Sequence, residues 1–280
     1  NKIKYVNGID GPANKNRLCV KGRFGFDYVN NPERLTKPLI RIKGKKKDLH
    51  PSINFSNIHE YFREASWEEA IDFAAEGFLD LKKKRNGKSN LAGFGSAKCS
   101  NEEAYLFQKL IRTGFNTNNV DHCTRLCHAS SVAALLETIG SGAVTAPFYE
   151  VEHSDVIIVI GANPTENHPV AATFFKNAAK KGSKLIVMDP RGHALKKHAT
   201  HMLQFKPGSD VALLNSIMNV IIEENLFNTE YIKKQTEGFD KLKKHLKNYS
   251  PDIMENETGI SADLIREVAR LYANTDKGII

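Results

Sequence analysis

The sequence has few of the residues that mark several classes of protein. Four cysteines in 280 residues are too sparse for a disulfide scaffold. The longest apolar runs, such as Val156–Ile160, are far shorter than the roughly 20 residues that cross a bilayer. The sequence therefore excludes a disulfide-stapled domain and predicts no membrane span.

Motifs that recognise nucleic acids and nucleotides are also missing. The net charge of +8 fits a basic binding surface, but no lysine run alternates with aromatic residues and no RNA- or DNA-binding motif occurs. We therefore expect a solvated, lysine-rich surface and no nucleic-acid partner. There is no Walker A loop and no glycine fingerprint of a dinucleotide fold.

Neither end resembles a natural terminus. The chain begins with Asn1 and no signal-peptide pattern, and it ends where an apolar segment is just beginning. We expect it to be a piece of a longer polypeptide.

The hydrophobic pattern alternates between strand and helix. An uninterrupted apolar strand at 155–160, a helix at 168–181 and a strand at 184–188 form a βαβ unit, which implies a parallel sheet. Another helix is expected to begin at Ser66, where Ser66 as N-cap and Glu69 form a capping box. The remaining expected elements are helices at 100–111, 130–139, 210–224, 229–235, 239–248 and 261–273, a strand at 91–95, and short β-like pieces at 2–6, 18–20 and 39–42.

Cysteine and histidine gather in one segment, at His122, Cys123, Cys127 and His128. Cysteines one helical turn apart beside histidines could bind zinc, although the spacing fits no common zinc signature. A cysteine next to a histidine and Arg125, just before a helix, would instead favour the thiolate that a redox metal prefers. A buried structural cysteine remains the default, so these residues alone leave the three interpretations open.

A second set of candidates follows the expected strands. Gly161-Ala162-Asn163-Pro164 and Asp189-Pro190-Arg191 lie where parallel sheets bind ligands, but a proline-containing turn explains them equally well. Pro207-Gly208-Ser209-Asp210 precedes a helix and is either a capped turn or a set of amides directed at an anion.

These segments occur together, in this order, in one family. The chain resembles the catalytic subunit of molybdopterin-dependent formate dehydrogenases, most closely the soluble NAD-linked type. The resemblance extends over essentially the whole chain. It is carried by Arg17-Leu18-Cys19-Val20-Lys21-Gly22, Gly95-Ser96-Ala97, Asn118-Asn119-Val120-Asp121, Arg125-Leu126-Cys127-His128, Gly161-Ala162-Asn163-Pro164, Asp189-Pro190-Arg191 and Pro207-Gly208-Ser209-Asp210.

The resemblance implies a role for individual residues. Cys127 matches the cysteine or selenocysteine that binds molybdenum or tungsten, and His128 matches the histidine assigned to proton transfer. Cys19 matches the last of four cysteines that hold a 4Fe–4S cluster, and Lys21 the lysine between cluster and pterin. Residues in segments that bind the pterin guanine dinucleotide are Gly161, Asn163, Glu166, Asp189, Arg191, Gly208 and Asp210.

It also implies an incomplete molybdopterin oxidoreductase fold of the α/β class. Residues 1–50 would be a small, mostly-β remnant of the iron–sulfur domain, 51–124 the first part of an α/β domain, and 125–280 a Rossmann-like domain that binds the pterin dinucleotide. The implied cofactor is a molybdenum or tungsten bis-molybdopterin guanine dinucleotide.

The implied reaction is oxidation of formate in the cytoplasm, with electron-transfer subunits that carry iron–sulfur, flavin and NAD sites. Three of the four cluster cysteines are absent, since none precedes Cys19, and we expect the chain alone to be inactive.

Two alternatives remain at this stage. The first is another molybdopterin oxidoreductase, such as a nitrate reductase or an assembly relative without metal. Periplasmic nitrate reductases have Met after the metal-binding cysteine, so His128 argues against them. The second is a non-catalytic nucleotide- or zinc-binding module, which elemental analysis would distinguish.

Overall fold

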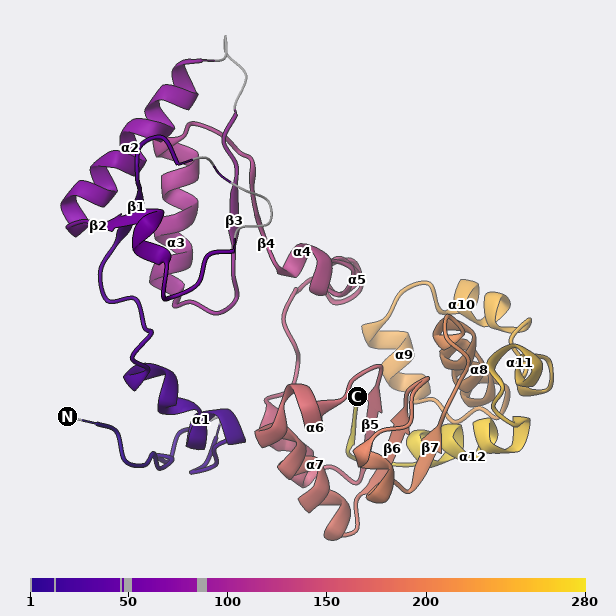
Figure 1. Cartoon of the computed structure of the whole chain (residues 1–280). Coiled ribbons are helices and arrows are strands. Elements are labelled where there is room, and N and C mark those ends of the chain that lie inside the picture. The colour runs from indigo at the N-terminus through magenta and orange to yellow at the C-terminus, as the bar shows by residue number, and fades with distance from the viewer. Residues whose placement is uncertain (1, 13, 46, 48–51, 85–89) are drawn as a thin grey trace. The chain divides into compact units, whose positions relative to one another are not determined.

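The computed structural model describes residues 2–12, 14–45, 47, 52–84 and 90–280. It divides the chain into two compact units (Figure 1): unit 1 comprises Asn1–Phe26 and Ala146–Ile280, and unit 2 comprises Asp27–Thr145. The boundaries expected near residues 50 and 124 do not coincide with this division, and the first of them lies outside the described residues. The three-part domain assignment stays a prediction.

A four-stranded parallel sheet forms the centre of unit 1. Its order is β7-β6-β5-β8, with β5 at Val156–Ile160, β6 at Lys184–Met188, β7 at His201–Leu203 and β8 at Gly278–Ile279. The chain passes from β5 to β6 through α6 (Pro164–Asn167) and α7 (Pro169–Lys180). The predicted βαβ unit and parallel sheet are therefore confirmed.

Helices cover both faces of this sheet, as Figure 1 shows. Alternate residues of β5 and β6 point to opposite faces. Those on one face pack against α8 (Asp210–Glu223) and α12 (Ala262–Ala273): Val156, Ile158, Ile186 and Met188. Those on the other face pack against Phe174 and Ala178 of α7: Ile157, Val159, Leu185 and Val187. Burial on both faces explains why the strands are uninterrupted apolar runs.

The other helices of unit 1 are α9 (Thr229–Gln235), α10 (Phe239–Leu246) and α11 (Pro251–Thr258). The helices expected at 210–224, 229–235 and 261–273 are confirmed, and the one expected at 239–248 ends earlier, at Leu246. Sequence analysis missed α11. Its signals were present, because Pro251 occupies the first helical position and Gly259, with φ +74°, ends the helix.

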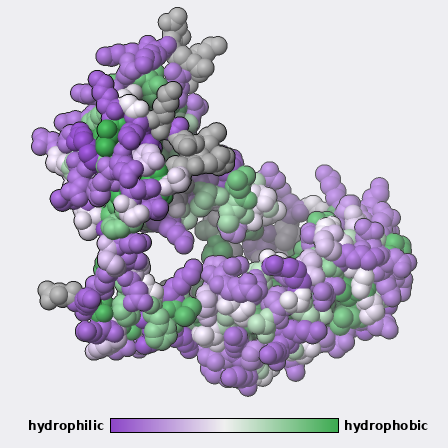
Figure 2. All heavy atoms as spheres, in the orientation of Figure 1, coloured by the Kyte–Doolittle hydropathy of each residue, from purple (hydrophilic) through white to green (hydrophobic). Residues whose placement is uncertain are grey.

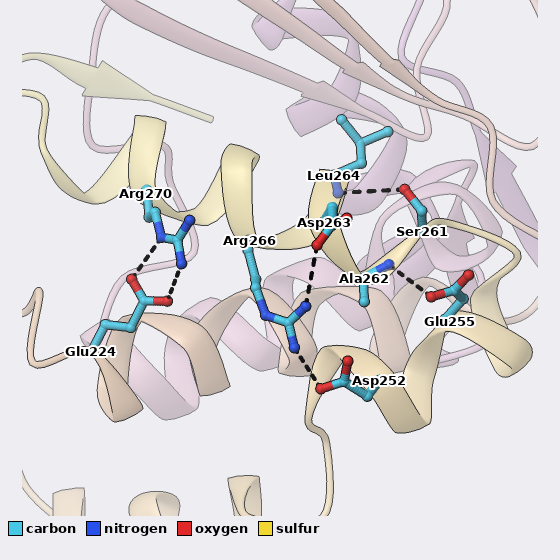
Figure 3. Close-up of polar contacts among 9 residues, drawn as sticks. All are labelled: Glu224, Asp252, Glu255, Ser261, Ala262, Asp263, Leu264, Arg266 and Arg270. Carbon is cyan, nitrogen blue, oxygen red and sulfur yellow. Dashed lines mark hydrogen bonds and ion pairs between the residues drawn. The ribbon is translucent and has the colours of Figure 1, made fainter.

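Ion pairs join α12 to its neighbours (Figure 3). Arg270 makes two hydrogen bonds of 2.8 Å to the carboxylate of Glu224, which follows α8. Arg266 pairs with Asp252 of α11 and with Asp263. These contacts orient α12 while its opposite side packs on the sheet.

Within its described residues, unit 2 contains two small sheets and four α-helices. Strands β1 (Leu39–Arg41) and β2 (Phe62–Glu64) are antiparallel, whereas β3 (Gly93–Gly95) and β4 (Val120–His122) are parallel. The helices are α2 (Trp67–Lys83), α3 (Asn101–Lys109), α4 (Thr124–Cys127) and α5 (Ala129–Ile139). The expected helix at 100–111 is shorter than predicted, because the chain continues as a π-helical turn at Leu110–Gly114.

The helices α2 and α3 begin with different capping hydrogen bonds. Ser66 accepts from the Glu69 N–H as expected, but the Glu69 carboxylate pairs with Arg63. The complete capping box lies instead at α3, where Ser100 and Glu103 each accept from the other's backbone N–H.

Unit 2 buries little apolar surface. Its buried hydrophobic residues, within the described part, are Ile40, Leu91 and Ile111, and the rest of the core lies in unit 1. Figure 2 shows hydrophobic side chains at the surface around α4 and α5, where Leu126 is 96% exposed and Leu136 is also exposed. Hydrophobic burial therefore stabilises unit 2 far less than unit 1.

The first residues of the chain are not β-like. The strands expected at 2–6 and 18–20 are wrong, because neither segment has a partner strand and Cys19 is the N-cap of α1 (Val20–Phe24). The piece at 39–42 does form β1. Across the described residues, every helix is too short or too polar to span a bilayer.

Candidate functional site

Three loops follow the carboxyl ends of β5, β6 and β7 and lie at one edge of the parallel sheet. Backbone hydrogen bonds join them: Gly161 N–H donates to the Met188 carbonyl at 2.9 Å, and Asp189 N–H donates to the Leu203 carbonyl at 3.2 Å. The loop with Gly208 follows β7. The structure thus brings the three segments singled out in the sequence to the edge where α/β sheets bind ligands.

Two glycines leave the backbone open at this edge. Gly161 has φ +59° and Gly208 has φ +85°, and a Cβ at either would meet no atom within 4 Å. Their left-handed conformation favours glycine, and the missing side chain allows a phosphate to approach the amides.

Two candidate side chains are buried here. Asp189 Oδ1 accepts from the Arg191 N–H at 2.7 Å, and Asn163 Oδ1 accepts from the hydroxyl of Thr165. The other side chains named from the sequence are exposed: Glu166, Arg191 and Asp210. Buried acceptors beside exposed charged groups suit a ligand with both a polar ring and phosphates.

Sequence analysis missed two residues at this edge. Gln204 Nε2 donates to the Pro190 carbonyl at 3.1 Å and so links the loops after β6 and β7. His193 Nδ1 accepts from the Leu195 N–H, while its Nε2 is buried with no partner in the described chain. The orphaned nitrogen, open glycines and buried carboxylate fit a surface that a pterin dinucleotide would cover. The sequence gives no sign of either residue, because both hydrogen-bond to backbone atoms, which every residue type has.

A cavity of about 1030 Å³ lies at the opposite, amino edge of the same sheet. Residues of both charges line it, including Asp155, Lys184 and Arg270, and His201 Nε2 lies 2.9 Å from Glu267 within it. We favour the carboxyl edge as the ligand site, because parallel α/β sheets bind ligands there.

Cys127 and His128 lie in unit 2, at the junction of two helices. Cys127 ends α4, and His128 (φ −137°, ψ 15°) links α4 to α5. His128 N–H donates to the Thr124 carbonyl and its own carbonyl accepts from Val132 N–H, each at 2.9 Å. Both side chains are exposed, and within the described residues the imidazole makes no hydrogen bond. The backbone is held while the two reactive side chains remain accessible.

The Arg125 side chain, which was expected beside the thiols, pairs with a carboxylate instead. Arg125 Nε donates to Asp121 at 2.9 Å, and this hydrogen bond lowers the pKa of the Asp121 carboxyl. Arg125 therefore pairs with Asp121, and its positive charge is not reserved for Cys127. The pair joins strand β4, which contains Asp121, to helix α4, which contains Arg125.

The donor set argues against a structural zinc site. No group of three His, Cys, Asp or Glu residues that could hold a metal occurs in the described parts of the chain. Structural zinc uses four protein ligands. A metal bound to Cys127 would take its other ligands from a cofactor, and an exposed thiol fits that requirement.

A pocket of about 560 Å³ lies at the carboxyl ends of β3 and β4 within unit 2. Its lining includes Ser96, Cys99, Glu103, Arg112 and His122. Its volume falls in the range of about 300–1000 Å³ that is typical of small-molecule sites. The pocket brings the Gly95-Ser96 segment next to the segment that leads to Cys127.

Cys19 and Lys21 lie at the start of α1 in unit 1. Backbone N–H groups of Gly22 and then Lys21 hydrogen-bond to the Cys19 thiol and lower its pKa, which favours the thiolate that binds metals. Lys21 is exposed. Cys19 is the only cysteine of unit 1, so the residues present do not complete a 4Fe–4S site, which needs four ligands.

Arg17 attaches this segment to α7. Its guanidinium carbon lies 4.0 Å from the ring centroid of Phe174, and Nη2 lies 3.9 Å from Glu152. Phe174 is 1% exposed and makes an edge-to-face contact with Phe148 at 5.3 Å. The segment that carries Cys19 and Lys21 is thus attached to the rest of unit 1 through Arg17, which contacts both Phe174 and Glu152.

Comparison with known proteins places this geometry in a family. The family described as Molybdopterin oxidoreductase matches residues 34–261. The chain is 38% identical over 269 residues to the F420-dependent formate dehydrogenase subunit alpha of Methanocaldococcus jannaschii, which covers 96% of this chain and 37% of that relative. It is 36% identical over 284 aligned positions to formate dehydrogenase H of Escherichia coli, covering 100% of this chain and 38% of that relative.

A solved structure shows the same fold. Acetylene hydratase from Pelobacter acetylenicus aligns with a TM-score of 0.78 at 24% identity, over 95% of this chain and 35% of that chain. At this identity the similarity concerns the fold alone.

The chain belongs to the molybdopterin oxidoreductase family. The relatives named above within that family are formate dehydrogenases, and the chain spans less than two fifths of their length. The predicted family and fold class are confirmed. The NAD-linked type gains no support from these relatives, since one is named for F420.

Proposed function

We propose that this chain is part of the catalytic subunit of a formate dehydrogenase. The observation that carries the proposal is the exposed Cys127 thiol at the end of α4, followed directly by His128, in a chain whose relatives are named formate dehydrogenases. The reaction converts formate to carbon dioxide, two electrons and a proton.

The residues of unit 2 would bind the metal and move the proton. Cys127 would hold molybdenum or tungsten of a bis-molybdopterin guanine dinucleotide, which when bound accepts the two electrons. Imidazoles exchange protons near neutral pH, so His128 would take the proton that formate loses. Its ring is exposed and makes no hydrogen bond to any described residue, so none has to break before it turns toward substrate.

The carboxyl edge of unit 1 would bind the dinucleotide. Gly161 and Gly208 would admit the pyrophosphate, Asp189 and Asn163 would accept from the guanine or ribose, and Arg191 would face a phosphate. Glu166 and Asp210 border the same surface. Lys21 would place a positive charge beside the pterin.

Cys19 would supply one ligand of a 4Fe–4S cluster whose other ligands are not in this chain, so the chain alone does not define the electron route. The proposed partners are electron-transfer subunits with iron–sulfur, flavin and NAD sites, and the proposed compartment is the cytoplasm.

The test compares Cys127→Ala with the control Cys123→Ala in the full-length enzyme. We expect Cys127→Ala to lose formate-dependent dye reduction and bound molybdenum or tungsten, and Cys123→Ala to retain both. Near-normal formate oxidation by Cys127→Ala refutes the assignment. Nitrate reduction without formate oxidation indicates the nitrate reductase alternative, and zinc as the only bound metal indicates a binding module.

A further inference from the structure

Two thiols share one turn of helix in unit 2. Cys123 is the N-cap of α4, with helical backbone angles (φ −55°, ψ −26°), and its carbonyl accepts from the Cys127 N–H at 3.2 Å. Residues four apart on a helical turn lie on the same face, with Cβ atoms about 5–6 Å apart. Both cysteines are exposed, so a small reagent reaches either sulfur.

The turn is able to tighten enough to join them. A disulfide needs Cβ atoms about 3.5–4.5 Å apart, so the two residues must approach by roughly 1–2 Å. No residue of α4 is buried, and Leu126 between the cysteines is 96% exposed. The movement strains a few hydrogen bonds of one turn and breaks no packing in a core.

The surroundings of the two sulfurs differ. Cys123 Sγ lies 3.7 Å from Nδ1 of His122, and the same Nδ1 accepts from the Thr124 N–H at 3.1 Å and lies 2.8 Å from Thr124 Oγ1. Thr124 therefore already uses the lone pair of this nitrogen, and the ring is not a free base for the Cys123 thiol. Both thiols are exposed, and the variants below decide which of them attacks first.

We propose that Cys123 and Cys127 form a reversible thiol–disulfide site. Cys123 sulfur attacks a low-molecular-weight dialkyl disulfide such as glutathione disulfide, whose S–S bond breaks and releases one glutathione. Cys127 sulfur then displaces the second glutathione, so two thiols lose two protons and two electrons while glutathione disulfide is reduced to two glutathione molecules. The consequence for function rests on the proposed function: the disulfide would block the metal-binding thiol until it is reduced.

The first test treats purified, metal-free full-length protein with glutathione disulfide and maps its disulfides by mass spectrometry. We expect a Cys123–Cys127 disulfide in the wild type and in Cys99→Ser. In Cys127→Ser we expect a stable glutathione adduct on Cys123, and in Cys123→Ser no internal disulfide at Cys127. Circular dichroism of each variant checks that it is folded. A wild-type chain that carries only glutathione adducts, or that joins Cys99 to Cys123 or Cys127, overturns the proposal.

A second arm separates this site from the metal assignment. In the full-length enzyme loaded with molybdenum, we expect glutathione disulfide to leave Cys127 unmodified and to form no Cys123–Cys127 bond. If the internal disulfide forms equally in loaded and metal-free protein, the thiol–disulfide site stands and the assignment of Cys127 to the metal fails. If it forms in neither, the thiol–disulfide site fails whatever the metal content.

Discussion

Replacing Phe174 with leucine should loosen the N-terminal segment that carries Cys19 and Lys21. The buried ring contacts the Arg17 guanidinium at 4.0 Å on one side and the Phe148 ring at 5.3 Å on another. Leucine remains apolar, but it has no aromatic face for Arg17 and no edge for Phe148. The substitution therefore removes these two contacts, a longer contact with Lys15 Nζ at 5.8 Å from the ring centroid, and part of the buried volume.

The expected loss is a sum of three moderate effects. A cation–π contact contributes about 0.5–2 kcal/mol, and an aromatic edge contact about 0.5–1.5 kcal/mol. The smaller side chain adds roughly 1 kcal/mol of lost burial. We expect the free energy of unfolding of unit 1 to fall by about 2–4.5 kcal/mol, within the range of core substitutions.

Urea denaturation of Phe174→Leu, Arg17→Met and the double variant measures these effects. We expect a coupling energy of about 0.5–2 kcal/mol between the two positions and faster tryptic cleavage near Arg23 in Phe174→Leu. Phe227→Leu is the matched control, because its ring pairs with Phe239 at 5.0 Å and should show no coupling to Arg17→Met. A coupling near zero at Phe174, or equal coupling at Phe227, refutes this account of how the segment is attached.

Three further predictions concern backbone, charge and thiol. Gly161→Ala should lower the free energy of unfolding by about 1 kcal/mol, because φ at this residue is +59°. Gly77→Ala should raise it by about 0.5–1 kcal/mol, because Gly77 lies within α2 and a Cβ there meets open space. If urea denaturation gives the same sign for both variants, the backbone argument is wrong. The Arg270 hydrogen bond lowers the pKa of Glu224, so the stability that this pair contributes is present above the ordinary glutamate pKa of 4.5 and is lost as pH falls through the lowered value. The stability advantage of wild type over Glu224→Gln should therefore shrink in acid unfolding below that pH, and a constant difference would show that the pair contributes nothing. Cys19 should react with iodoacetamide at lower pH than Cys99, because backbone N–H groups of α1 lower the pKa of the Cys19 thiol. Gly22→Pro removes the first of those N–H groups and should move the pH dependence of the Cys19 reaction to higher pH. An unchanged pH dependence in Gly22→Pro would mean that the Gly22 N–H is not the cause.

Much of unit 1 was predictable from local patterns. An uninterrupted apolar run such as Val156–Ile160 is typical of a strand that is buried on both faces. Because a helix follows this strand before the next one begins, the two strands were expected to pair in parallel, as they do. Helix starts were predictable where a side chain caps its own backbone, as Ser100 does. The missed helix at Pro251–Thr258 had signals of another kind, Pro251 at its first position and Gly259 after its last.

The sequence by itself determined the alternation of strands and helices, the family, and the neighbouring thiol and imidazole of Cys127 and His128, because each depends on residues close along the chain. Only the tertiary structure decided which distant residues meet. It paired Arg270 with Glu224, placed Arg17 against Phe174 and left His193 Nε2 buried without a partner among the described residues. These outcomes depend on competition among many possible partners, and hydrophobic periodicity carries no record of which partner a charged or aromatic side chain finally contacts.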